Sequence, residues 1–313
     1  MAHHDTPRPI RSLTRRTALA TALSLPAFRP AQAAGFPALA SFSILADMLR
    51  QIAGDAAEIT ALVGPDQDLH GFTPRPSDLL RLRQARLMVI NGLGLESWAE
   101  SLAQSAGFSG VAVVATRGLA ALPSGQHKGS DTGPSHAHGA VDPHAWQDVG
   151  NARAYIANMT AGLARAEPSR EGEFRQRAAA YQQRLDALDV DIRAMMAAIP
   201  RARRRILTTH DAFGYFADAY DVDFIGVQGT SLTAEPSPRE MARLISQIRT
   251  GSIRALFFEN MSAPTLLRQI ASETGARIGG TLYADALSGP SGPASTYIDM
   301  MRHNARTIAE ALR

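Results

Sequence analysis

The sequence contains two series of short apolar runs, and most of these runs are followed by a segment with helical periodicity. Strand-length apolar runs that alternate with helices indicate a parallel sheet covered by helices. The first series predicts strands at residues 38–43, 57–62, 87–90 and 111–115, and the second at 205–209, 223–227, 255–258 and 277–282. We therefore expect an α/β protein with two (β/α) lobes.

Residues 173–199 lie between the two series and contain neither glycine nor proline. One helix over this stretch would be about 40 Å long, since an α-helix rises about 1.5 Å per residue. We expect it to join the lobes as a rigid brace, which places the lobes at 34–150 and 201–313 and a helical linker at 151–200. Other helices are expected at 44–52, 78–84 with Ser77 as N-cap, 96–106, 238–249, 264–274 and 295–312.

Residues 1–33 have the pattern of a cleaved export signal. A basic segment that includes Arg15 and Arg16 precedes a short apolar run, and Ala31-Gln32-Ala33 is a small-residue cleavage site. We expect cleavage near Ala33/Ala34 and a periplasmic mature protein. The Arg15-Arg16 pair fits a twin-arginine signal, and an ordinary secretory signal is the alternative.

The charge of the chain resides largely in this leader. Removing its five Arg and one Asp from 32 basic and 29 acidic side chains leaves 27 and 28. Without a basic excess there is no electrostatic reason to expect nucleic acid as a partner. The chain has no cysteine, so a metal site would have to use His, Asp and Glu.

Three histidines and one aspartate lie in short stretches built like metal-ligand loops. These residues are His70, His144, His210 and Asp285. Three imidazoles and a carboxylate complete a tetrahedral shell for zinc and leave no position for a reactive water. The set therefore favours metal binding over catalysis. For the carboxylate, Asp285 is preferred because it follows a tight Gly279-Gly280 approach, with Glu259, Glu235 and Asp211 as the other candidates.

Two further groups of residues have weaker assignments. Glu259 follows an apolar strand, and we expect it either as the alternative ligand or as a hydrogen-bonding group behind the ligands. His127, His136 and His138 lie in the loop 123–140, which is rich in Gly, Ser and Pro. We expect this loop to be flexible, and its histidines either capture metal or form only a polar loop.

Several segments carry a resemblance to a known family. They are Asp68-x-His70-x-Phe72-x-Pro74-x-Pro76-Ser77-Asp78, Asn91-Gly-Leu-Gly-Leu-Glu96, Asp142-Pro143-His144-x-Trp146, His210-Asp211-Ala212-Phe213, Gln228-Gly229 with Glu235-Pro236, and Gly279-Gly280-x-Leu282-Tyr283-x-Asp285. With them the mature chain resembles the solute-binding proteins of zinc and manganese ABC importers, called cluster A-I. Within this family it is most similar to the AztC-type zinc-binding proteins.

The resemblance implies two (β/α) lobes joined by one long helix, with metal bound in the cleft by His70, His144, His210 and Asp285. The third ligand is often Glu in the manganese-specific branch, and His210 in its place favours Zn²⁺ over Mn²⁺. Expected partners are an inner-membrane ABC permease and its ATPase, and a periplasmic zinc metallochaperone is a further candidate. We expect a monomer. The same role for manganese or iron is the main alternative, and a secreted zinc hydrolase is a second alternative that no catalytic motif supports.

Overall fold

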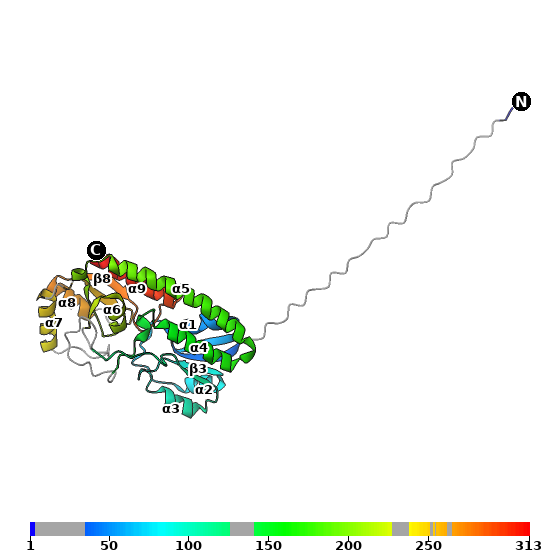
Figure 1. Cartoon of the computed structure of the whole chain (residues 1–313), viewed down its shortest axis with the longest axis horizontal. Helices are drawn as coiled ribbons and strands as arrows, with labels where there is room; N and C mark the ends of the chain where they lie inside the picture. The colour runs from blue at the N-terminus through cyan, green and yellow to red at the C-terminus, as the bar shows by residue number, and fades with distance from the viewer. Residues whose placement is uncertain (4–34, 126–140, 227–237, 251–252, 254, 262–264) are drawn as a thin grey trace. The chain divides into compact units, whose positions relative to one another are not determined.

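We describe residues 1–3, 35–125, 141–226, 238–250, 253, 255–261 and 265–313 of a computed structural model (Figure 1). The chain divides into two units, Met1–Ala33 and Ala34–Arg313. The predicted signal and the loop with His127, His136 and His138 lie almost entirely outside the described residues. The second unit contains both predicted lobes.

The first sheet has four parallel strands in the order β2-β1-β3-β4. The strands are β1 (Phe36–Phe42), β2 (Ala57–Val63), β3 (Leu87–Ile90) and β4 (Val111–Val114). The helices between them are α1 (Ser43–Ala53), α2 (Pro76–Gln84) and α3 (Ala99–Ala106). Because β1 is central and mostly buried, its apolar run is nearly continuous, as in other parallel sheets.

The second sheet repeats this arrangement in the order β6-β5-β7-β8, again with parallel strands. Its strands are β5 (Arg205–Thr208), β6 (Asp223–Gly226), β7 (Ala255–Glu259) and β8 (Arg277–Leu282). The helices α6 (Gly214–Tyr220), α7 (Pro238–Thr250) and α8 (Thr265–Thr274) belong to this lobe. The two predicted parallel-sheet lobes are therefore confirmed.

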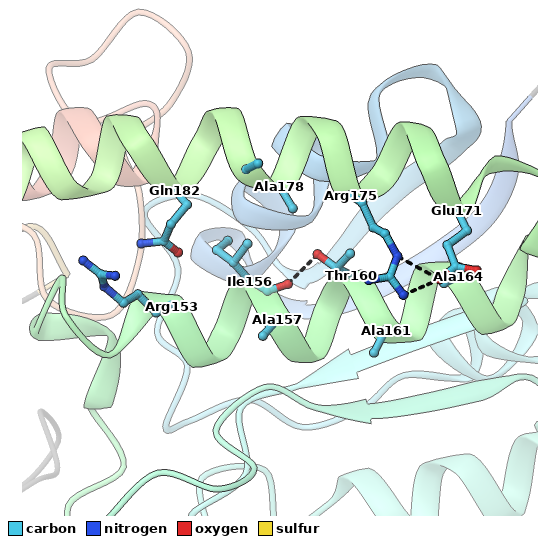
Figure 2. Close-up of a pocket in the computed structure, with 11 residues that line it drawn as sticks. Arg153, Ile156, Ala157, Thr160, Ala161, Ala164, Glu171, Arg175, Ala178 and Gln182 are labelled. Carbon is cyan, nitrogen blue, oxygen red and sulfur yellow. Dashed lines mark hydrogen bonds and ion pairs between the residues drawn. The ribbon is translucent and has the colours of Figure 1, made fainter.

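The predicted long helix is α5 (Glu171–Ala197), a helix of 27 residues. It packs against α1 in the first lobe, against α6 in the second, and against the last helix α9 (Tyr297–Leu312) (Figure 1). It also lies beside α4 (Ala152–Ala166), and the hollow between α4 and α5 has a volume of about 420 Å³. Figure 2 shows the alanines of both helices that line this hollow. One helix thus contacts elements of both lobes.

The largest apolar cluster continues through both lobes. It includes Phe42 of β1, Trp146, Tyr181 of α5, Phe216 of α6 and Tyr297 of α9. Two smaller clusters cover the other sides of the two sheets. The lobes therefore share one core, which restricts how far they can move apart.

Several helix starts differ from the predicted ones by one to three residues. Helix α2 begins at Pro76, and Ser77 is not its cap, because the carboxylate of Asp78 accepts the backbone N–H of Arg75 at 2.8 Å. Helix α3 begins at Ala99, three residues after Glu96, whose side chain turns back and accepts the backbone N–H of Asn91 at 2.8 Å. Among the described residues, no helix combines the length and apolar character needed to cross a membrane.

Candidate metal centre

The four predicted ligands lie on connections that follow strands. His70 lies in the turn after β2, His210 follows β5 by two residues, and Asp285 follows β8 by three. His144 lies between β4 and α4 and precedes a 3₁₀ turn, Ala145–Gln147. Ligands of open parallel sheets gather at the carboxyl ends of the strands, and each lobe contributes two of these residues.

The structure brings these four side chains together, with all four ligand atoms within 4.8 Å of one another. Oδ2 of Asp285 lies 2.9 Å from Nε2 of His70 and 3.1 Å from Nε2 of His210. Nε2 of His144 lies 3.5 Å from Nε2 of His70 and 3.5 Å from Oδ1 of Asp285. Three imidazole nitrogens and one carboxylate thus converge on one point, the donor set that suits a tetrahedral divalent ion.

The group is almost completely buried. The side chains of His144, His210 and Asp285 are 0% exposed, and that of His70 is 12% exposed. Among the described residues, the buried Oδ1 of Asp285 makes no hydrogen bond, and its printed contact is the long ion pair of 3.5 Å with Nε2 of His144. A buried carboxylate oxygen without a hydrogen bond is costly, so this atom fits the site of a cation.

Charges inside the group shift its pKa values in opposite directions. Burial alone would raise the pKa of Asp285, but the imidazoles of His210, His70 and His144 hold it well below 3.8. Burial lowers the pKa of His210, and the carboxylates of Glu259 and Asp285 more than offset this, so that pKa lies well above 6.5. The pKa of His144 is raised in the same way by Asp142 and Asp285 against the effect of burial. Without a metal, protons on the imidazoles therefore balance the negative charge of the carboxylates.

A carboxylate orients each of the two deeply buried imidazoles. Asp142 Oδ1 lies 2.7 Å from Nδ1 of His144 and also accepts the backbone N–H of that histidine at 2.9 Å. Glu259 pairs with Nδ1 of His210 and accepts the backbone N–H of His210 at 2.9 Å. A carboxylate at Nδ1 leaves Nε2 free to coordinate and makes it a stronger donor.

The turn that carries His144 is bonded directly to the segment that carries Asp285. Trp146 Nε1 and Gln147 Nε2 both donate to the carbonyl oxygen of Ala284, at 2.8 and 2.7 Å. The hydroxyl of Tyr297 in turn donates to the carbonyl of Trp146 at 2.6 Å. These bonds are buried, so they hold His144 and Asp285 firmly in relation to each other.

The remaining predicted site residues have different positions. Asp211 is half-buried and does not belong to the group of four, and Glu235 lies outside the described residues, as do His127, His136 and His138. Glu259 is not a member of the group but pairs with His210. The sequence reasoning missed Asp142 as the partner of His144, although its place two residues before a candidate ligand was a usable signal.

The family model described as zinc-uptake complex component A, periplasmic, named ZnuA, matches residues 39–311. The chain belongs to the ZnuA family. This match spans both sheets, the long helix and all four residues of the group. The expected membership of the metal-importer binding proteins is thereby confirmed.

Relatives of the ZnuA family align with most of this chain. The iron-binding protein YfeA of Yersinia pestis is 32% identical over 275 residues, 88% of this chain and 86% of the relative. The manganese-binding lipoprotein MntA of Halalkalibacterium halodurans is 31% identical over 278 residues, 89% of each chain. The zinc-binding protein TroA of Treponema pallidum is 32% identical over 278 residues, 87% of each chain.

Solved structures of the family share this fold. TroA of Treponema pallidum superimposes with a TM-score of 0.79 at 30% identity, covering 89% of this chain and 99% of TroA. A manganese-bound periplasmic metal-binding protein from candidatus liberibacter asiaticus gives 0.75 at 27% identity, covering 89% of this chain and all of the other. This ZnuA-family chain is thus a metal-binding substrate-binding protein of the ABC-transporter type, and its relatives are named for different metals.

Proposed function

We propose that this protein captures zinc in the periplasm with His70, His144, His210 and Asp285 and delivers it to an ABC permease for import. The convergence of three imidazole nitrogens and a buried carboxylate from both lobes carries the proposal. A neutral imidazole triad and one carboxylate would leave a bound divalent ion with a net local charge of about +1. The carboxylates of Asp142 and Glu259 lie directly behind two of the imidazoles and add negative charge that favours a cation.

Zinc is favoured over manganese and iron by the nature of the donors. Imidazole nitrogen is softer than carboxylate oxygen, and four donors suit the tetrahedral preference of zinc, whereas manganese favours more oxygen donors. The relatives are named for zinc, manganese and iron, so membership of the family leaves the metal open. His210, the third of the four residues along the chain, carries the preference for zinc.

The number of donors also distinguishes a site that binds zinc from a site that uses zinc for hydrolysis. A catalytic zinc site keeps a coordination position for water and needs a general base beside it. Glu259 is the carboxylate that a hydrolase mechanism would nominate, but its side chain is engaged with His210 and with Thr209. Four converging donors, together with a Glu259 carboxylate that is already paired, support metal binding and release over hydrolysis.

Export and partners complete the proposal. Residues 1–33 would direct the chain to the periplasm and be removed near Ala34, and the mature monomer would dock to an inner-membrane permease that an ATPase drives. A periplasmic metallochaperone that loads the site and a capture role for the loop 123–140 are compatible additions. Relatives named as metal ABC transporter substrate-binding lipoproteins support the transporter partner.

The test is the metal content of the mature protein purified from the periplasm, measured by mass spectrometry for wild type, His210→Ala and Asp285→Ala. His303→Gln is the matched control, because His303 lies in the same lobe and pairs with the carbonyl of Thr281 at 3.0 Å, outside the group. We expect about one zinc per chain in wild type and control and a strong loss in both site variants. Manganese or iron in place of zinc would contradict the assignment of the metal. Unchanged zinc content in both site variants would contradict the assignment of the ligands.

A further inference from the structure

Asp66 has a backbone conformation that side chains rarely adopt. It lies in the turn between β2 and His70, follows Pro65, and has a φ of 52°. Glycine is the usual residue at such an angle, because a Cβ atom is disfavoured there. A residue held in this conformation needs compensating contacts from its surroundings.

Those contacts come from the other lobe. Oδ1 of Asp66 accepts a hydrogen bond from Nδ2 of Asn260 at 2.9 Å, and Oδ2 accepts one from the backbone N–H of Gly289 at 3.0 Å. The backbone N–H of Asp66 donates to the carbonyl of Leu287 at 2.9 Å. Leu287 and Gly289 follow Asp285, and Asn260 follows Glu259, the partner of His210. One residue of the His70 loop is therefore bonded to both C-terminal segments that build the site.

The bonds of Asp66 differ in exposure from those that hold the other ligands. Its two side-chain bonds are exposed, whereas the bonds from Trp146 and Gln147 to Ala284 are buried. A hollow of about 450 Å³ lies beside Asp66. Its lining includes Pro65 of the same turn and three residues of the Asp285 segment, Leu287, Ser288 and Pro290. The other lining residues are Ser43, Arg50, Ala61 and Ser295. Hydrogen bonds that water can replace open at lower cost.

We propose that Asp66 is a latch: it positions His70 against Asp285 and sets the rate at which the bound metal leaves. The inference rests on the proposed function, because it assumes that His70 and Asp285 bind metal. His70 is the one of the four predicted ligands whose side chain is not fully buried, and it pairs with Asp285 at 2.9 Å. Opening the latch frees the His70 loop from the Asp285 segment while the buried contacts of the other three residues persist.

Asp66→Gly is the most informative variant. Glycine adopts a φ of 52° without strain and keeps the backbone bond to Leu287, so the substitution removes the side chain without straining the backbone. Asp221→Gly is the matched control, because Asp221 also has a positive φ, 57°, and its carboxylate pairs with Arg201 and Arg204 inside one lobe. The two variants differ in whether the lost contacts cross between lobes.

A pair of substitutions tests whether Asp66 acts through its bond to Asn260. Asn260→Asp places a carboxylate opposite Asp66, where the amide now donates, and should open the latch by repulsion. Adding Asp66→Asn reverses the bond, because the amide of residue 66 now donates to the carboxylate of residue 260. The amide oxygen of residue 66 can still accept the backbone N–H of Gly289. The double variant should therefore recover slow release, which is expected only if the two residues act through their shared bond.

The measurement is stopped-flow transfer of zinc from the mature protein to a chromogenic chelator in excess. We expect release on the order of tenfold faster for Asp66→Gly and for Asn260→Asp, near wild type for the double variant, and unchanged for Asp221→Gly. A wild-type rate in Asp66→Gly, or equal acceleration in Asp221→Gly, would overturn the latch. Absence of stoichiometric zinc binding by the wild type would instead overturn the proposed function, so the two failures are distinguishable.

Discussion

At the scale of single residues, the site depends on carboxylates that do not belong to the group of four. Asp142 and Glu259 each contact the Nδ1 atom of one imidazole and also accept the backbone N–H of that same histidine. Such a two-point contact fixes both the rotation of the ring and the position of the chain. The Nε2 atoms are thereby directed at one point before any metal arrives.

Glu259→Gln should weaken zinc binding roughly ten- to hundredfold, because the neutral amide makes the His210 imidazole a poorer donor and orients it less firmly. A competitive titration against a chelator of known affinity measures the change. Glu96→Gln is the control, since Glu96 is also buried but bonds Ser41 and Asn91 in the first lobe. Equal losses of affinity in both variants would show that Glu259 acts only through stability.

His210→Glu should shift the metal preference toward manganese, because a carboxylate oxygen is a harder donor than imidazole nitrogen. Placing a second carboxylate beside Glu259 adds repulsion, so the combination with Glu259→Gln should bind manganese more tightly than His210→Glu alone. Competition between zinc and manganese at equilibrium, read by mass spectrometry, gives the ratio. An unchanged ratio would mean that residue 210 does not determine the preference.

At the scale of elements, continuous apolar runs identified the strands because burial on both faces removes polar residues from them. The run Leu87–Ile90 coincides with β3, and the stretch without glycine or proline, residues 173–199, forms most of α5. Helix starts were harder to predict, because side chains near them turn back: Asp78 of α2 accepts the N–H of Arg75, and Glu96, just before α3, accepts the N–H of Asn91. The latch of Asp66 joins residues 194 positions apart in sequence, so no local pattern reveals it.

One close contact between elements yields a test of packing. Gly162 of α4 faces β4, where an added Cβ would lie well inside contact distance of a methyl group of Val113. Val113 is β-branched and stiff, so Gly162→Ala should destabilise the metal-free protein by about 1–3 kcal/mol despite the better helix propensity of alanine. Thermal unfolding measures the loss. Adding Val113→Ala should recover part of it, and no recovery would place the strain elsewhere.

At the scale of the whole molecule, the shared core argues against lobes that move as independent bodies. Trp146, Tyr181 and Tyr297 belong to the same apolar cluster, and Tyr297 also bonds Asp47 of α1 through its backbone N–H at 2.8 Å. Opening the lobes widely would expose this core and cost much apolar burial. Metal exchange is then expected to use local opening at the exposed edge of the site, where His70 and Asp66 lie.

Protons and metal compete for the same buried group, and the pKa shifts set the direction of this competition. Burial lowers the pKa of His210, but Glu259 and Asp285 leave it well above 6.5, so this imidazole keeps its proton at higher pH than a free histidine does. Metal must displace that proton. As pH decreases, zinc affinity should therefore begin to fall at a pH that is still above the usual titration range of histidine.

The fold itself should outlast the metal during acidification. A raised histidine pKa contributes stability that is full below pH about 6.5 and is lost as pH rises through the raised value. The lowered pKa of Asp285 contributes stability that is present above pH about 3.9 and is lost as pH falls through the lowered value. Between these limits the metal-free site is stabilised by its own charges. Acidification from neutral pH, followed by chelator absorbance for zinc and by circular dichroism for the fold, should show zinc released while the helices remain, and simultaneous loss of both would contradict this charge balance.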